Sequence, residues 1–232
     1  MTHDKKVTCF LPCRQGSERV PRKNIKPFGE YQHGLIEVKL NQLLQSNCID
    51  EVVLSTNDSD ILAYASTINS PKLRVHERAS ALSSSQTSTD DLVAHALELI
   101  PTGHILWTHV TSPFIGSNLY DDVIAQYFEA LTKGFDSLMT VTPIHGFLWQ
   151  NNKPMNYDRS KEKWPRTQTL TPVHEVNSGV FLAPTDIYRN QNDRIGQKPY
   201  LYELDKLVSH DIDWPEDFVL AECMLKEKLV SV

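Results

Sequence analysis

The chain alternates short apolar runs rich in β-branched residues with segments of helical periodicity, and this alternation limits the possible folds more than any other feature. The runs predicted as strands are 6–12, 51–56, 104–110, 136–144 and 177–184, and the predicted helices are 35–47, 59–67, 88–100 and 118–134. A short strand leading into a helix is predicted over 211–229. Such alternation is typical of α/β proteins, so we expect a doubly wound, mostly parallel sheet covered by helices on both faces. Ligands bind such sheets at the carboxyl ends of the strands.

Length and composition narrow the class of protein. The 232 residues suit one large domain, or a domain with an appendage, and are enough to bury a substantial core. No run approaches the roughly 20 apolar residues of a membrane span, and the first apolar run is too short for a secretory signal, so we expect a cytoplasmic protein without a membrane partner. A net charge of -6 argues against a general nucleic-acid binder. The four cysteines contain no C-x-x-C pair, which predicts buried small side chains rather than disulfides or a zinc site.

A basic segment follows the first predicted strand. Within residues 14–26 it has one acid, Glu18, and five basic residues, which are Arg14, Arg19, Arg22, Lys23 and Lys26. Guanidinium and ammonium groups form charge-assisted hydrogen bonds with phosphate oxygens, which favours a triphosphate site. The segment contains neither G-x-x-x-x-G-K-[ST] nor G-x-G-x-x-G, and the alternative is a solvated basic loop.

Residues 145–172 interrupt the pattern. The segment is polar and rich in Pro and Asn, and a structureless loop of this length is uncommon in a compact domain. We therefore expect a functional arm or an interface, with short strands of its own. Its aromatic residues Phe147, Trp149, Tyr157 and Trp164 fit interface anchors, and the alternative is a local mini-core under a surface loop.

The basic segment also carries a resemblance to a known family. "LPCRQGSERVPRKNIKPF" resembles the N-terminal motif of the acylneuraminate cytidylyltransferases, which reads approximately I-P-A-R-x-G-S-K-R-x-P-x-K-N. Four further segments resemble family motifs in the same order: "VVLSTNDSDILAYA", "THVTSPF", "VNSGVFL" and "DIDWPEDFVLAE". The resemblance implies a Rossmann-like nucleotidyltransferase fold, with one cytidylyltransferase domain over residues 1–232 in which 145–172 is an inserted dimerisation arm. A homodimer is therefore expected.

The resemblance implies a reaction as well. The anomeric oxygen of a nonulosonic, sialic-acid-like sugar would attack the α-phosphorus of CTP, giving the CMP-sugar and pyrophosphate. This chemistry relies on positioning and charge neutralisation. Alternatives are a nucleotidyltransferase for another 3-deoxy-ulosonic acid or a sugar 1-phosphate, and a non-catalytic nucleotide-binding protein of the same fold. The absence of a Gly-rich loop disfavours the sugar 1-phosphate enzymes.

Site residues are carried over from the resemblance position by position. Arg14, Lys23 and Asp211 would be catalytic. The nucleotide would be bound by Arg14, Ser17, Arg22, Lys23, Asn24, Arg78, Ser88 and Thr89. Ser88 and Thr89 could equally cap the helix that follows them.

Asp211 and Asp213 are the candidate metal ligands. They lie two apart in a predicted short strand, so their carboxylates project to the same face. Paired carboxylates together with phosphate oxygens suit Mg²⁺, and the resemblance assigns the catalytic metal to this pair. From the sequence alone, an acidic pair before a helix also fits a cap and a solvated turn.

The acidic sugar would contact His109, Thr111, Ser112, Arg166, Gln168, Asn177 and Ser178. Two departures from the family pattern leave the identity of this sugar open: His109 stands where Gln is usual, and "FIG" replaces the Arg that commonly follows Thr-Ser-Pro. A lone His at a strand end is often structural. Asn57 stands where the family often has Asp.

Overall fold

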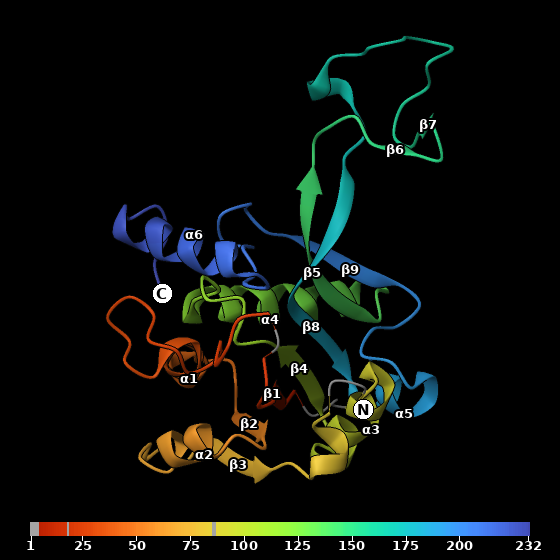
Figure 1. Ribbon diagram of the computed structural model, residues 1–232. Coiled ribbons are helices and arrows are strands. Elements are labelled where there is room, and N and C mark those ends of the chain that lie inside the picture. The colour runs from red at the N-terminus through yellow and green to blue at the C-terminus, as the bar shows by residue number, and fades with distance from the viewer. Residues whose placement is uncertain (1–4, 18, 85–86) are drawn as a thin grey trace.

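The computed structural model describes residues 5–17, 19–84 and 87–232. A seven-stranded sheet with the order β3-β2-β1-β4-β8-β5-β9 forms its centre (Figure 1). The strands are β1 (Val7–Cys13), β2 (Glu51–Thr56), β3 (Leu73–Glu77), β4 (His104–Thr108), β5 (Ser137–Ile144), β8 (Val173–Pro184) and β9 (Pro199–Glu203). β8 pairs antiparallel with β4 and β5, and the remaining pairs are parallel. The predicted mostly parallel α/β sheet is confirmed.

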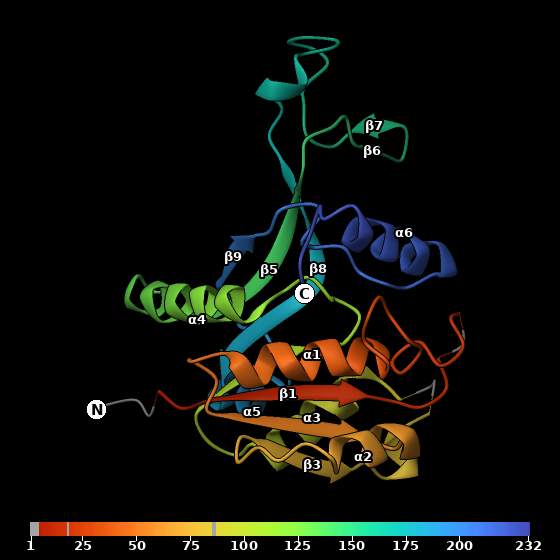
Figure 2. The same cartoon turned by 90° about the vertical axis from the view of Figure 1, so that its left-hand side faces the viewer.

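Helices cover both faces of the sheet (Figure 2). They are α1 (Gly34–Gln45), α2 (Ser59–Ala65), α3 (Thr89–Leu99), α4 (Ser117–Thr132), α5 (Thr185–Gln191) and α6 (Pro215–Lys226). One hydrophobic core lies under α1, α4 and α6, and a second lies under α3 and α5. Alternation along β1 serves both cores, because Cys9 and Leu11 face the first and Phe10 faces the second.

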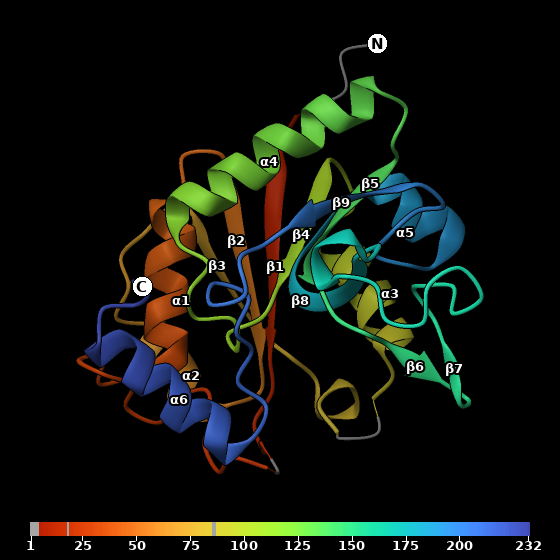
Figure 3. The ribbon, with the colours of Figure 1, turned by 90° about the horizontal axis from the view of Figure 1, so that it is seen from above.

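α6 covers the loop that leads into α1. Phe218 of α6 meets Phe28 edge to face, with ring centroids 5.5 Å apart. Seen from above, α4 crosses over the strands and α6 lies beside α1 (Figure 3). This packing brings the segment before α6 close to the basic loop that follows β1.

Several elements differ from the sequence prediction. β3, β9 and α5 were not predicted, and β3 and β9 are the two edge strands. Edge strands are exposed on one side, so β3, with its polar sequence "LRVHE", lacks the apolar run that reveals a central strand. The burial predicted for the cysteines holds for Cys9 and Cys13 and is wrong for Cys48 and Cys223, which are exposed.

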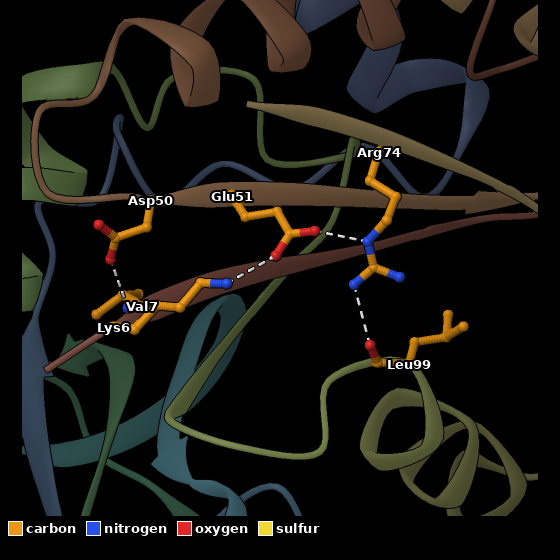
Figure 4. A network of polar contacts seen from close by, with 6 residues as sticks. All are labelled: Lys6, Val7, Asp50, Glu51, Arg74 and Leu99. Carbon is orange, nitrogen blue, oxygen red and sulfur yellow. Dashed lines mark hydrogen bonds and ion pairs between the residues drawn. The ribbon is translucent and has the colours of Figure 1, made fainter. Parts of the chain in front are cut away.

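Polar contacts connect the neighbouring strands at the end of the sheet where β1 and β2 begin (Figure 4). Glu51 accepts from Lys6 (3.1 Å) and from Arg74 (2.5 Å), and Arg74 also donates to the Leu99 carbonyl (2.9 Å). Asp50 accepts from the backbone N–H of Val7 (2.8 Å). These contacts hold β1, β2 and β3 in register at their amino ends, away from the carboxyl ends where ligands bind.

Residues 145–172 leave the body of the protein on a two-stranded ribbon formed by β5 and β8 (Figures 1 and 2). Pairing continues to Ile144 and Val173, at the base of this segment. The segment contains the expected short strands, β6 (Trp149–Gln150) and β7 (Lys153–Pro154), and the short helix η2 (Thr167–Thr169). Among the described residues, no helix has both the length and the apolar character to cross a membrane.

Candidate active site

A cavity of about 350 Å³ opens at the carboxyl ends of β1 and β4, and we call it the basic pocket. Its polar lining consists of Arg14, Ser17, Arg19, Lys23, Asn24, Arg78, Thr89, His109, Thr111, Arg194 and Asp213. The structure thus brings together all of the predicted nucleotide-binding residues except Arg22 and Ser88. They come from loops far apart in the chain, which meet because parallel strands end at the same edge of the sheet.

The loop after β1 is fixed by polar contacts to its backbone. Asn24 donates to the Arg14 carbonyl (3.2 Å), and the Gln15 N–H donates to Oδ1 of Asn57 (2.9 Å). Asn57 replaces the Asp that is frequent in the resembling family. Since an amide keeps an acceptor oxygen, the substitution retains this support for the loop.

Two predicted nucleotide contacts lie elsewhere. Arg22, with φ of 55°, pairs through Nη2 with Asp60 of α2 (2.6 Å) and lies outside the basic pocket. Ser88 caps α3 by accepting from the Asp91 N–H (3.0 Å), so Ser88 has the capping role that was the alternative to nucleotide binding. Thr89 lines the basic pocket.

Arg78 is a deeply buried cation of the basic pocket. Arg78 is 3% exposed, and its Nε and Nη2 have no hydrogen-bond partner among the described residues. Burial lowers the pKa of its guanidinium. Buried donors without acceptors raise the free energy of the protein, so this side chain is suited to a ligand that brings acceptor atoms.

His109 is a neutral link between two strands. Trp107 Nε1 donates to His109 Nε2 (3.0 Å), and His109 Nδ1 donates to the Ser178 carbonyl (3.0 Å). Burial lowers the pKa of His109 to about 4. Both ring nitrogens are used in the neutral form, so the structural interpretation accounts for this side chain without a role as a base.

Arg194 completes the wall of the basic pocket beside His109 and was not among the predicted site residues. Its guanidinium lies over the Phe181 ring at 3.7 Å and near Trp107 at 5.2 Å. None of the described carboxylates forms an ion pair with it. The residue follows α5, an element that was not predicted, and only the packing of that segment on β4 and β8 brings Arg194 to the pocket.

A larger cavity of about 1010 Å³ lies next to the basic pocket, and we call it the carboxylate pocket. Its polar lining consists of Thr142, His145, Glu175, Asn177, Ser178, Asp205, Lys206, Ser209, Asp211 and Asp213. Asp213 lines both cavities. A molecule in one pocket therefore meets a molecule in the other at this residue.

Two of the predicted sugar contacts lie in the carboxylate pocket at the inner part of β8. Asn177 donates to Thr142 Oγ1 (3.0 Å) and accepts from Thr140 Oγ1 (2.7 Å), which fixes the orientation of its amide. Ser178 follows with φ of 57°, in the left-handed region that few residues adopt. This turn of the backbone directs the Ser178 carbonyl toward His109.

Asp211 and Asp213 do not lie in a strand, so the predicted short strand is wrong. The segment is irregular, because its Ile212 N–H donates to the Thr111 carbonyl (2.9 Å) and its Asp213 N–H donates to Asp217 of α6 (3.0 Å). The same contacts bring both residues to the carboxylate pocket.

The environments of the two carboxylates differ. Asp211 Oδ1 is buried without a partner among the described residues. Burial raises the pKa of Asp211 and the charge of Asp213 adds to this, while a hydrogen bond with Thr111 opposes it. Asp213 instead pairs with Arg19 (3.3 Å) and Lys23 (3.4 Å). Arg19, a basic residue that was not among the predicted contacts, is therefore part of the site.

The carboxylate oxygens of Asp211 and Asp213 suit a hard cation. A buried carboxylate oxygen without a partner beside a second carboxylate is an arrangement that Mg²⁺ would stabilise. No group of three or more His, Cys, Asp or Glu side chains in the described ranges is placed to hold a metal. Two protein carboxylates would therefore need further oxygen ligands from phosphates and water, which is the usual pattern for Mg²⁺ at phosphoryl-transfer sites.

The remaining predicted sugar contacts are divided. Thr111 lines the basic pocket, whereas Ser112 is buried behind it and lines neither cavity. Arg166 and Gln168 are exposed in the arm and also line neither cavity. Within one chain, Arg166 and Gln168 are thus not brought to the site.

The aromatic residues of the arm pack on one another. The Phe147 ring lies 5.2 Å from Tyr157 and 5.3 Å from Trp164, and Arg159 lies over Trp149 and Trp164. This is the local mini-core of the alternative interpretation. Trp164 is nevertheless 60% exposed, so the cluster keeps an apolar surface open to a partner.

Comparison with known proteins identifies the family. A sequence profile of the cytidylyltransferases, described as "Cytidylyltransferase", matches residues 8–228. The chain belongs to the cytidylyltransferase family. The family suggested by the motifs is thereby confirmed, and the pockets described above lie within the matched region.

Curated relatives of the cytidylyltransferase include enzymes for acidic sugars. The chain is 28% identical to a pseudaminic acid cytidylyltransferase of Campylobacter jejuni, with 95% of this chain and 97% of the relative covered. It is 24% identical to an N-acylneuraminate cytidylyltransferase of Streptococcus agalactiae, with 92% of this chain and 52% of that relative covered.

Solved structures support the fold. A CMP:2-keto-3-deoxy-manno-octonic acid synthetase complexed with CTP matches with a TM-score of 0.66 and 14% identity, covering 96% of this chain and 99% of its own. The 4-diphosphocytidyl-2C-methyl-D-erythritol synthase of Anaerococcus prevotii matches with a TM-score of 0.67 and 15% identity, with the same coverage. The Rossmann-like nucleotidyltransferase fold is therefore shown for this cytidylyltransferase.

Proposed function

We propose that this cytidylyltransferase transfers CMP from CTP to the anomeric oxygen of a nonulosonic acid. The observation that carries the proposal is the junction at Asp213, where a pocket lined with cations meets a pocket lined with carboxylates. A reaction between a triphosphate and a second substrate requires such a shared boundary. The relative named for pseudaminic acid covers almost the whole chain, which supports a nine-carbon acidic sugar as that second substrate.

The basic pocket would hold CTP. Arg14, Arg19 and Lys23 neutralise charge on the triphosphate, and Arg78 and Arg194 supply donors on its other walls. As the bond from the sugar oxygen to the α-phosphorus forms, the bond to the bridging oxygen of pyrophosphate breaks and the hydroxyl proton is released. Cations aligned with the departing phosphates stabilise the charge that develops there.

Asp211 and Asp213 would hold Mg²⁺, which would add positive charge beside the phosphate oxygens. Asn177 and Ser178 would contact the sugar in the carboxylate pocket, with Thr111 at the boundary. Because CTP is a cytoplasmic metabolite, we also propose that the enzyme works in the cytoplasm.

Pyrophosphate release tests this function. The purified chain is incubated with CTP, Mg²⁺ and, in turn, sialic, legionaminic, pseudaminic and 3-deoxy-octulosonic acids, with UTP and GTP as controls. Release with CTP and a nine-carbon acid is the expected result and would also name the sugar. Release with the eight-carbon acid alone would favour the 3-deoxy-ulosonic alternative, and CTP binding without release would leave only nucleotide binding.

Arg78→Met should weaken CTP binding by about tenfold to a hundredfold, because the ligand loses charge-assisted hydrogen bonds in a dry site. The melting temperature should not fall, since the wild-type donors are buried without partners. Titration calorimetry with CTP measures the change. Arg74→Met is the matched control. Arg74 lies near the start of β3, whereas Arg78 follows the end of β3, so Arg74 is at the end of the strand away from the pocket and should leave CTP affinity unchanged. Equal affinity in both variants would remove Arg78 from the nucleotide site.

We propose that residues 145–172 form the interface of a homodimer. The exposed Trp149 and Trp164 support this, because such side chains are enriched at interface cores. Sedimentation should show a dimer for the wild-type chain and a monomer when a short Gly-Ser linker replaces residues 147–165. The ribbon of β5 and β8 stays paired below the cut, so the shortened chain should keep its melting transition. A monomeric wild type would contradict the proposal.

A further inference from the structure

Lys39 of α1 is fully buried, and no acidic side chain among the described residues pairs with it. Its residue has 0% exposure, and its Nζ donates to the Ser112 carbonyl (2.7 Å) and to the Tyr120 hydroxyl (2.8 Å). None of the described carboxylates lies within ion-pair distance of it. Burial lowers the pKa of Lys39 to about 7.

Such a lysine is unfavourable for stability. Moving an ammonium group from water into the core carries a desolvation penalty that two neutral acceptors do not fully offset. Apolar residues of similar length, such as Met, would fill the same space in the core without this penalty. The presence of Lys39 therefore calls for an explanation other than packing.

The hydrogen bonds of Lys39 form a directed chain. Thr108 Oγ1 donates to the Gly179 carbonyl (2.7 Å), so the contact between Thr108 and Tyr120 (2.9 Å) uses the Tyr120 proton. The Tyr120 oxygen is then free to accept from Lys39. These hydrogen bonds lead from Lys39 on α1 through Tyr120 on α4 and Thr108 on β4 to Gly179 on β8.

Both branches from Lys39 end beside the two pockets. Ser112 follows Thr111, whose carbonyl accepts from Ile212, between the two candidate metal ligands. Gly179 follows Asn177 and Ser178 of the carboxylate pocket. Lys39 thus joins the turn that supports the carboxylates to the strand that lines the sugar side.

A second side chain of α1 supports the same turn. Gln42 lies one turn of helix after Lys39, and its Nε2 donates to the Pro113 carbonyl (2.6 Å). Residues 111–113 are therefore held from behind at two successive carbonyls. The face of α1 that meets this turn is polar in an otherwise apolar core.

We propose that Lys39 is a positioning residue that fixes the turn 111–113 relative to β8. Through the Thr111 carbonyl the turn holds the segment of Asp211 and Asp213, so Lys39 sets the width of the carboxylate pocket for the acidic sugar. The proposal rests on the function proposed above. Lys39 touches neither substrate, and it acts through Ser112 and Tyr120.

Lys39→Met in the full-length chain tests the proposal. We expect the KM for the acidic sugar to rise by about tenfold or more, because the turn that holds the Asp211 and Asp213 wall of the carboxylate pocket loses its tether. The Kd for CTP should rise less than this KM, since Thr111 is the one residue of the turn that lines the basic pocket. The melting temperature should stay equal or rise, since a buried charge is removed. Tyr120→Phe cuts only the branch to β8 and should give a smaller increase in the same KM.

Leu40→Met is the matched control, because Leu40 is equally buried on the next position of α1 and the change conserves volume. It should leave both substrates unaffected. A lower melting temperature with an unchanged sugar KM in Lys39→Met would overturn the proposal, as would an equal loss of affinity for CTP and sugar. Should Lys39→Met not fold, Tyr120→Phe carries the same comparison, and an unchanged sugar KM there overturns it.

A second measurement separates this proposal from the proposed function. Amide hydrogen exchange needs no turnover, and Lys39→Met should speed exchange of the amides of Thr111, Ser112 and residues 177–180 in the free protein. If no acidic sugar reacts but exchange increases there, the function fails and the tether stands. If exchange in both segments is unchanged, the tether is refuted whatever the sugar.

Discussion

Replacing Asp211 by Asn is expected to lower turnover by about a thousandfold or more, because a ligand of the proposed Mg²⁺ site is lost and metal ions supply several kcal/mol of transition-state stabilisation. Asn keeps the size of Asp and one acceptor oxygen, but it lacks the negative charge that a hard cation requires. Turnover is measured as pyrophosphate release over a range of Mg²⁺ concentrations. A partial recovery at high Mg²⁺ would agree with weakened metal binding.

The same substitution should not destabilise the protein. Asp211 has a buried oxygen without a partner among the described residues, and burial raises its pKa above the usual value for Asp. A carboxyl whose pKa is raised by folding lowers stability as pH rises through that pKa, and this penalty is absent below the pKa of the unfolded chain. In metal-free buffer, Asp211→Asn should therefore unfold at the same or a higher temperature at neutral pH, and the difference should vanish in acid.

Asp186→Asn is the control for Asp211. Asp186 is an exposed carboxylate on α5 that pairs with Arg189 (2.7 Å) away from both pockets, so its loss should change neither turnover nor stability by more than a small factor. Full activity in Asp211→Asn would remove the metal assignment. If Asp211→Asn loses both its activity and its folded state, the loss of activity is explained by unfolding. Circular dichroism shows whether the variant is folded.

The central part of the fold could be predicted because its signals are local. β1, β2 and β4 are continuous apolar runs, and such runs mark strands buried on both faces. The edge strands β3 and β9 have exposed side chains and gave no such signal. The segment of Asp211 and Asp213 read as a strand from its spacing, but hydrogen bonds to Thr111 and Asp217 set its actual path.

The residues of the site likewise divide into those that local sequence reveals and those that only the folded structure reveals. Arg14, Lys23 and Asn24 could be found because they lie in one short motif that resembles a family. Arg19, Arg194 and Lys39 could not, because their importance comes from what packs against them. Arg19 matters through Asp213, 194 positions later, and Lys39 matters through Ser112 and Tyr120. Tertiary partners of this kind leave no trace in local spacing.

Lys23→Met is expected to weaken CTP binding by about a hundredfold, because a nearly buried ammonium group is removed from the proposed triphosphate site. The Lys23 side chain is only 12% exposed, and its Nζ donates to the Ile212 carbonyl (2.6 Å) and lies 3.4 Å from Asp213. Lys23 therefore supplies charge to the basic pocket and also ties the loop after β1 to the segment of the carboxylates. Titration calorimetry measures the affinity.

Lys26→Met is the matched control, since Lys26 belongs to the same loop but lies over the Phe218 ring (4.2 Å) outside the basic pocket. It should change CTP affinity by less than about threefold, as expected for an exposed charge near a binding site. An unchanged affinity in Lys23→Met would contradict the phosphate role. An equal loss in both variants would indicate a general effect of net charge.

A series of ligands separates the two contributions of Lys23. Charge contacts with phosphate disappear as phosphates are removed, so the loss caused by Lys23→Met should decrease from CTP to CMP and be smallest for cytidine. The tether to Ile212 concerns the protein alone, so any loss from its removal should be the same for all three ligands. The difference between CTP and cytidine therefore measures the phosphate contact, and the loss that remains with cytidine measures how far the loop depends on the carbonyl of Ile212.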